Sequence, residues 1–199
     1  MSFTWRSGFD ERDTEYYAAV GFLCHQWNGV EHFVYGLASD AMQLERRFHG
    51  ILFRHLGIKA VQTFIEDYAI EHLEAETLAQ IRHVNAYVDR CRINRNTIVH
   101  GLPTSDPQSG QPMVRAPADR NRRTARNYPI SVNAIRQVCD ECEIAGLQLI
   151  QLQFLVMPDE KRAEFLENHI WGPGWEQSLH LKQPLPELLV ANPHESPTP

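Results

Sequence analysis

Several patterns that define common functional classes are missing from this sequence. The longest apolar runs are short, such as residues 18–24, so no segment is long enough to span a membrane. The first residues lack a basic start followed by an apolar stretch, and we therefore expect a cytoplasmic protein without a secretory signal. The sequence also has no glycine-rich phosphate loop and no His-Glu-x-x-His spacing. We therefore expect neither a P-loop or Rossmann site nor a cofactor.

Cysteine is also scarce, with four residues in the chain: Cys24, Cys91, Cys139 and Cys142. In a cytoplasmic protein these side chains are expected to be reduced thiols. Cys139 and Cys142 form one Cys-x-x-Cys pair inside a helical pattern, whereas a structural zinc site needs four ligands, usually as two such pairs. The sequence therefore favours cysteines that act as small buried hydrophobic residues, and no metal site.

Net positive charge is missing too, because the formal net charge is −6. The field of the whole molecule would not attract nucleic acid, so an anionic partner must be met by a local patch. One such patch is an arginine-rich stretch of twelve residues that contains Asp119 as its only acid. Its members are Arg115, Arg120, Arg122, Arg123 and Arg126. Two interpretations stay open, namely phosphate contacts with RNA or a solvated loop that docks an acidic protein partner.

The hydrophobic periodicity predicts four main helices, over residues 13–44, 59–72, 75–100 and 131–157, with a short fifth helix over 159–170. Gly101 and Pro103 end the third helix, and Ser131 caps the fourth.

Prolines interrupt residues 102–130, where 113–115 and 128–130 can pair as a hairpin. We therefore predict an all-α bundle of four main helices, in one domain over residues 1–170. Its core spans about 13–157 with an insertion at 102–130, and an irregular, proline-rich tail follows at 171–199.

Two charged residues fall on apolar helical stripes. Glu31 lies within the stripe of the first helix, which is formed by Tyr17, Val20, Cys24, Trp27, Val34 and Ala38. Arg95 lies within the stripe of the third helix, which is formed by Leu78, Ile81, Val84, Val88, Cys91 and Val99. Because charged residues are rarely buried unless paired, we expect Glu31 and Arg95 to lie together. Such a pair either fixes the helix register or holds the arginine at an anion-binding cleft.

A polar stripe on the third helix ends at a histidine. It comprises Arg82, Asn85, Asp89, Arg92, Asn96 and His100. Asn96 and His100 are four residues apart and share a face, and Arg95 flanks Asn96. Histidine is the side chain that exchanges protons near neutral pH, which suits a general acid or base, although a histidine that only caps the helix fits the same position.

The end of the third predicted helix reads Arg95-Asn96-Thr97-Ile98-Val99-His100-Gly101. This run resembles the arginine–four residues–histidine motif of HEPN domains, which also lies at the end of a long helix. Residues 27–31 of the first helix resemble the first core helix of that family, which often carries a glutamate. The resemblance covers about residues 13–157. It implies an all-α bundle that forms a two-fold homodimer with two arginines and two histidines in one cleft.

Many members of that family are metal-independent endoribonucleases in toxin–antitoxin, CRISPR-associated and phage-defence systems, and others are binding or scaffold modules. By resemblance, Arg95 and His100 are the catalytic pair, Asn96 supports them and Glu31 orients Arg95. Arg92 and the arginine-rich stretch would contact RNA. The implied partners are RNA, a second copy, and an antitoxin or other protein. The alternative is a non-catalytic module that recruits a protein or nucleotide.

Overall fold

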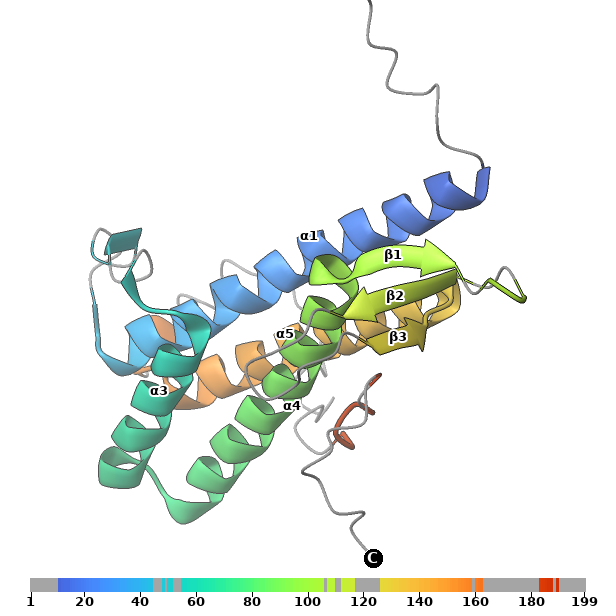
Figure 1. Ribbon diagram of the computed structural model, residues 1–199. Helices are drawn as coiled ribbons and strands as arrows, with labels where there is room; N and C mark the ends of the chain where they lie inside the picture. The colour runs from blue at the N-terminus through green and yellow to red at the C-terminus, as the bar shows by residue number, and fades with distance from the viewer. Residues whose placement is uncertain are drawn as a thin grey trace, which may run out of the picture.

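The protein is mostly helical, and three long helices dominate it (Figure 1). The computed structural model describes residues 11–44, 48, 50–51, 55–105, 107–109, 112–116, 126–158, 160–162, 183–187 and 189. The helices are α1 (Glu11–Ala41), α3 (Ile58–His72), α4 (Ala75–His100) and α5 (Val132–Val156). The bounds predicted for all four helices are confirmed to within three residues at each end. Of the short helix predicted over 159–170, only residues 160–162 are described, and they are helical.

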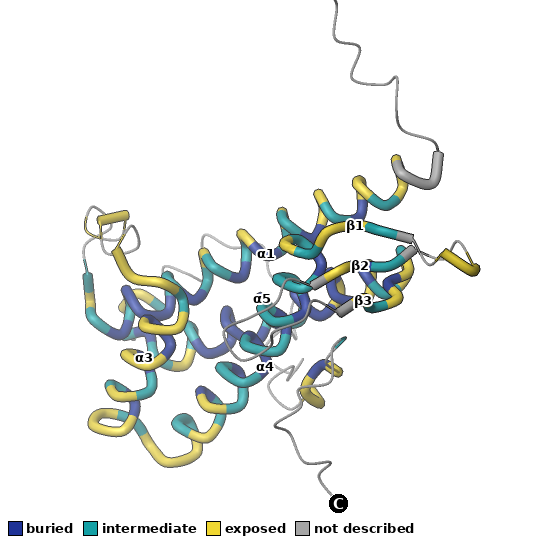
Figure 2. Tube along the Cα trace, in the orientation of Figure 1, coloured by how far each residue is buried: buried dark blue, intermediate teal, exposed yellow. Residues whose placement is uncertain are grey.

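Helix α1 packs against α5 and also against the hairpin formed by α3 and α4. Helices α1 and α5 form the most extensive helix–helix contact, while α3 and α4 form a hairpin that packs against both α1 and α5 (Figure 1). The core lies where α1, α4 and α5 face one another (Figure 2). No helix in the described part of the chain combines the length and the apolar character needed to cross a membrane.

The apolar stripe predicted for α4 is largely confirmed, and that of α1 is confirmed in part, because its members Trp27, Val34 and Ala38 are buried. Ile81, Val84, Val88 and Cys91 of α4 are all buried. On α1, the predicted stripe member Tyr17 is 46% exposed. The buried residues of α1 include Leu23, Trp27, Val30, Val34 and Leu37. Because α5 covers one side of α1 and the α3–α4 hairpin covers another, α1 buries a wide arc that a single stripe does not describe.

A three-stranded antiparallel sheet follows α4, in the region where the predicted helical bundle was expected to carry an insertion with a hairpin. Its strands are β1 (Leu102–Ser105), β2 (Pro112–Ala116) and β3 (Arg126–Pro129), in the order β1-β2-β3. The predicted hairpin is confirmed as the pairing of β2 with β3, in which Val114 lies opposite Tyr128. Strand β1 was not predicted. It carries Pro103, which has no backbone N–H, and it lies at the edge of the sheet, where proline is tolerated.

Gly101 ends α4 for a reason that differs from the prediction. A glycine that caps a helix usually adopts a left-handed conformation, but Gly101 is extended, with φ −74° and ψ 146°. A Cβ atom at this position would lie 1.8 Å from Cγ1 of Val114 and 2.5 Å from the carbonyl oxygen of Thr97. Gly101 therefore allows β2 to cross the end of α4 at close range.

Candidate functional site

The last turn and a half of α4 brings Arg95, Asn96 and His100 together. Nη1 of Arg95 donates a hydrogen bond to Oδ1 of Asn96 at 2.9 Å. The same Nη1 lies 3.2 Å from Nε2 of His100. Arg95 is half-buried, whereas His100 is exposed. The three residues that the sequence singled out on this helix therefore form one connected group at a surface.

Nε2 is the ring nitrogen of His100 that faces Arg95. A guanidinium has only donors, so Nε2 of His100 accepts this hydrogen bond, and its lone pair is directed at the guanidinium. In the described part of the chain, the Nε of Arg95 has no hydrogen-bond partner, and it is buried away from the surface where His100 is exposed.

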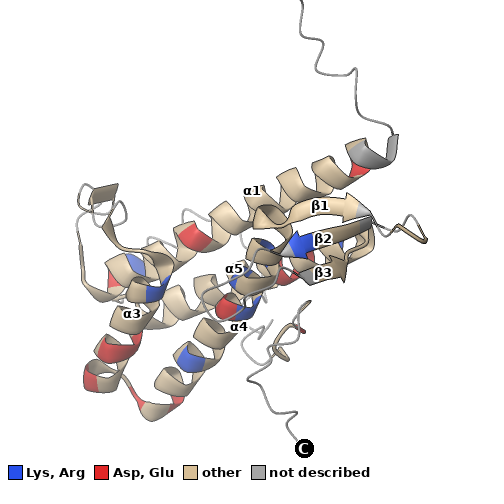
Figure 3. Cartoon of the chain, viewed as in Figure 1, with Lys and Arg blue, Asp and Glu red and all other residues tan. Residues whose placement is uncertain are grey.

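Strand pairing brings one further arginine to this end of α4. Leu102, two residues after His100, lies directly opposite Arg115 in the pairing of β1 with β2. Residues that are directly opposite in an antiparallel pair lie on the same face, and both Leu102 and Arg115 are exposed. Basic positions of α4 and β2 accordingly lie on neighbouring elements in Figure 3. Arg115 is thus the member of the arginine-rich stretch that the structure carries next to the motif helix.

The other predicted phosphate contacts in the arginine-rich stretch are described only in part. Arg120, Arg122 and Arg123 lie outside the described residues. Arg126 begins β3, where it lies opposite Ala116.

Glu31 and Arg95 do not form the predicted ion pair among the described side chains. The carboxylate of Glu31 accepts a hydrogen bond from the indole Nε1 of Trp27 at 2.8 Å. Trp27 is one turn earlier on the same helix, so Glu31 finds its partner locally. The prediction that Glu31 orients Arg95 was therefore wrong, and Asn96 occupies that place instead.

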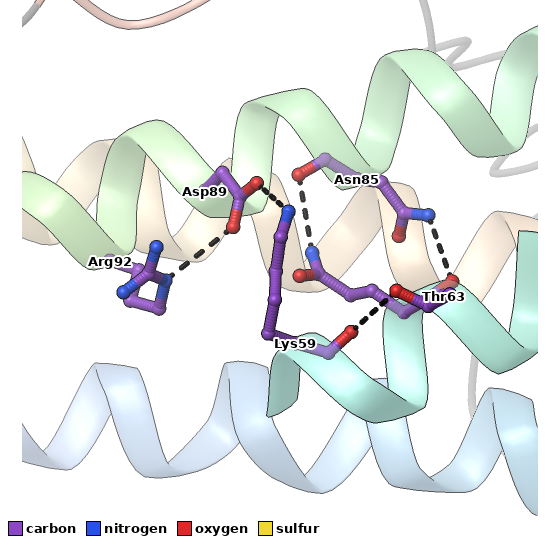
Figure 4. Close-up of polar contacts among 6 residues, drawn as sticks. Lys59, Thr63, Asn85, Asp89 and Arg92 are labelled. Carbon is purple, nitrogen blue, oxygen red and sulfur yellow. Dashed lines mark hydrogen bonds and ion pairs between the residues drawn. The ribbon is translucent and has the colours of Figure 1, made fainter. Parts of the chain in front are cut away.

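The N-terminal half of the polar stripe packs against α3 (Figure 4). Asp89 forms an ion pair with Lys59 of α3, and Nε of Arg92 lies 3.4 Å from Oδ1 of Asp89. Nearer the start of α4, Asn85 exchanges hydrogen bonds with Gln62 of α3. Arg92, a predicted RNA contact, is thus already paired with a carboxylate. The stripe separates into a structural half against α3 and a second half in which Asn96 is half-buried and His100 is exposed.

The cysteines are free thiols, and three of them, Cys91, Cys139 and Cys142, are buried as predicted. Burial raises the pKa of Cys139 to about 11, and a hydrogen bond with Cys142 together with burial raises that of Cys91 further. These thiols are therefore protonated at neutral pH. Within the described residues, no three His, Cys, Asp or Glu side chains gather in an arrangement that could hold a metal ion.

Two functional candidates, Asn94 of α4 and Glu141 of α5, were missed by the sequence analysis. Asn94 is 1% exposed and Glu141 is 9% exposed. Burial raises the pKa of Glu141, hydrogen bonds from Gln137 and Asn94 act against this, and the carboxylate of Glu187 raises it further. Asn94 lies in register with the buried residues Cys91 and Ile98. The same stripe argument that selected Arg95 would have found it.

Comparison with protein-family models, with curated proteins and with solved structures gave no significant match.

Proposed function

We propose that this protein is a HEPN-like endoribonuclease, with a helical-bundle core, that cleaves RNA in the cytoplasm without a metal ion. The observation that carries the proposal is the contact of Arg95 with His100 at the exposed end of α4, with Asn96 on the same guanidinium. An imidazole in contact with a guanidinium at a surface is a combination suited to phosphate chemistry.

RNA carries its own nucleophile, and this determines which groups the reaction needs. When Arg95 turns from Nε2 of His100 to the phosphate, that nitrogen takes the proton from a 2′-hydroxyl, whose oxygen attacks the adjacent phosphorus atom. The bond from phosphorus to the 5′-oxygen breaks, and that oxygen receives a proton from the imidazolium of His100. The products are a 2′,3′-cyclic phosphate and a 5′-hydroxyl. Arg95 stabilises the negative charge that builds up on the phosphate oxygens, because its planar fork matches their geometry.

A second copy of the chain completes the proposed site. In a two-fold dimer, two α4 ends would face each other, and each would contribute Arg95 and His100 to one cleft. Arg115, beside the end of α4, supports RNA binding from the strand side. A role as a toxin held in check by an antitoxin, or as a phage-defence effector, fits such an activity.

The experiment is RNA cleavage by the full chain in the presence of EDTA. Unmodified RNA and the same RNA with every 2′-hydroxyl methylated are incubated in parallel, and the new ends are identified by mass spectrometry. We expect cleavage of the unmodified RNA alone, with 2′,3′-cyclic phosphate ends. Cleavage of the methylated RNA would overturn the mechanism. Loss of cleavage of the unmodified RNA when EDTA is present would overturn it as well.

A non-catalytic module that recruits a partner is the second candidate function. The observation in its favour is a chain segment held by its backbone on the buried Asn94 of α4, which is a binding mode and not a catalytic one. An intact fold that leaves every RNA uncut would favour this function over the first.

A further inference from the structure

Part of the proline-rich C-terminal tail lies on α4 (Figure 1). The docked segment consists of residues 183–187 and 189. Its three hydrogen bonds to α4 use its backbone: Nδ2 of Asn94 donates to the carbonyl oxygen of Glu187 at 2.8 Å, and the N–H of Leu189 donates to Oδ1 of Asn94 at 3.0 Å. Four residues before Glu187, the carbonyl oxygen of Gln183 lies 2.9 Å from Nε2 of His83, which is about three turns before Asn94 on α4.

This pattern recognises an extended peptide. A carbonyl group and the N–H two residues later lie on the same side of an extended chain, so one amide side chain can hold both. Asn94 thus acts as one residue of a neighbouring strand would act. Since the contacts are to the backbone, they do not depend on which side chains residues 187 and 189 carry. Selectivity comes from elsewhere, beginning with Pro186, which is buried.

The floor of this site contains a carboxylate whose hydrogen bonding is incomplete. Glu141 of α5 is buried, and in the described part of the chain its Oε2 has no hydrogen-bond partner. Asn94 links this carboxylate to the docked segment. The segment itself presents Glu187, whose negative charge raises the pKa of Glu141. The backbone of the chain's own tail therefore fits the site, but the negative charge of Glu187 is unfavourable beside that of Glu141.

We infer that the surface formed by His83, Asn94 and Glu141 is a docking site for an extended, proline-containing segment of a partner protein that carries a basic side chain where this chain has Glu187. The chain's own tail is the weaker occupant, which such a partner displaces. A lysine or arginine at that position would replace the repulsion of Glu141 with an attraction. This inference is independent of ribonuclease activity.

The first experiment compares two labelled peptides by fluorescence anisotropy. One peptide copies residues 183–189, and the other differs only by Glu187→Lys. Each is titrated with the full chain and with a full chain that carries Pro186→Asp, which weakens the tail in its own site. We expect the lysine peptide to bind about threefold to tenfold more tightly than the glutamate peptide. Equal affinities, or no binding of the lysine peptide to either protein, would overturn the inference.

Three variants of the full chain separate the contribution of the Glu141 charge from that of the Asn94 backbone contacts. Glu141→Gln should remove the difference between the two peptides, because it removes the charge that distinguishes them. Asn94→Ala should weaken the binding of both peptides to the same extent, because it removes the contacts to the peptide backbone. Asn96→Ala, two residues along the same helix and without a contact to the segment, should change neither. An Asn94→Ala protein that binds both peptides as the wild type does would contradict the site.

Hydrogen exchange at the amide of Leu189 tests the docking within the chain itself. This amide should be protected in the wild type and in Asn96→Ala, and should lose its protection in Asn94→Ala. The protection should not change with protein concentration. Protection that rises with concentration would identify the tail of a second copy as the occupant, and would overturn the assignment of a partner protein.

Discussion

At the scale of single residues, the contact between α4 and β2 depends on the missing side chain of Gly101. Its backbone is extended, a conformation open to any residue, so the space around it is what restricts this position. The nearest atoms are a side-chain carbon of Val114 and a backbone oxygen of Thr97, and the second cannot turn away as a side chain can.

Gly101→Ala should therefore destabilise the fold. Overpacking of this kind costs about 1–3 kcal/mol, which corresponds to a fall of roughly 2–12 °C in Tm for a chain of this size. Thermal unfolding followed by circular dichroism measures the change. Gly29→Ala is the matched control, because a Cβ there meets nothing within 4 Å and alanine favours a helix by about 0.5–1 kcal/mol. A Gly101→Ala protein as stable as Gly29→Ala would contradict the close approach.

Glu141 should make the stability of the fold depend on pH. Its folded-state pKa is raised above the ordinary value of 4.5, chiefly by burial, so the native state holds the proton more tightly than the unfolded chain does. The stabilisation is complete below that ordinary value and is lost as the pH rises through the raised pKa. In denaturant unfolding from about pH 4 to about pH 8, the stability of Glu141→Gln should increase relative to that of the wild type as the pH rises. A constant difference across this range would contradict the assignment.

At the scale of elements, the helices could be predicted because their signals are local. The hydrophobic period, the N-cap Ser131 and the stop after His100 all lie within the segments that they define, and the structure places α4 and α5 accordingly. Strand β1 could not be predicted, since four residues with a proline carry no strand pattern and become a strand only through pairing with β2. Tertiary pairing of this kind lies beyond a single segment of sequence.

The candidate site likewise has a part that the sequence could predict and a part that it could not. Arg95, Asn96 and His100 lie on one helix, so their spacing alone predicted that they would meet. Glu31 and Arg95 lie on different helices, and the periodicity shows which side of each helix is apolar but not which neighbour it faces. Trp27, four residues before Glu31, supplied the nearer partner. The docked tail was predicted to be irregular, and nothing in its sequence shows that Asn94 would hold it.

The start of α5 should depend on its cap. Oγ of Ser131 accepts a hydrogen bond from the N–H of Ala134 at 3.1 Å, which satisfies one of the free donors of the first turn. Ser131→Ala should cost about 1 kcal/mol of stability, or roughly 2–4 °C in Tm. Ser131→Asp should retain most of the stability, because its carboxylate can accept the same bond. Equal losses in the two variants would show that the cap contributes nothing.

At the scale of the whole molecule, the net charge of −6 and the basic end of α4 act against each other. An acidic molecule repels RNA at a distance, so binding must come from a small region where cations gather. The proposed two-fold dimer would bring two such regions together and double the local positive charge at one cleft.

Light scattering coupled to size-exclusion chromatography should therefore give about twice the chain mass of 22.9 kDa for the full chain. The same mass is expected for His100→Ala, because an exposed histidine is not needed to hold the two copies together. A mass of one chain at micromolar concentration would contradict the shared cleft.

The central claim is that His100, held by Arg95, carries RNA cleavage, and the cleavage rate of His100→Ala in EDTA tests it most directly. The control is His72→Ala, which removes an exposed histidine from the last turn of α3 and leaves α4 intact. With unchanged unfolding curves, we predict a rate lower by roughly 10²–10⁴ for His100→Ala and an unchanged rate for His72→Ala. A His100→Ala protein that cleaves RNA as fast as the wild type would contradict the account.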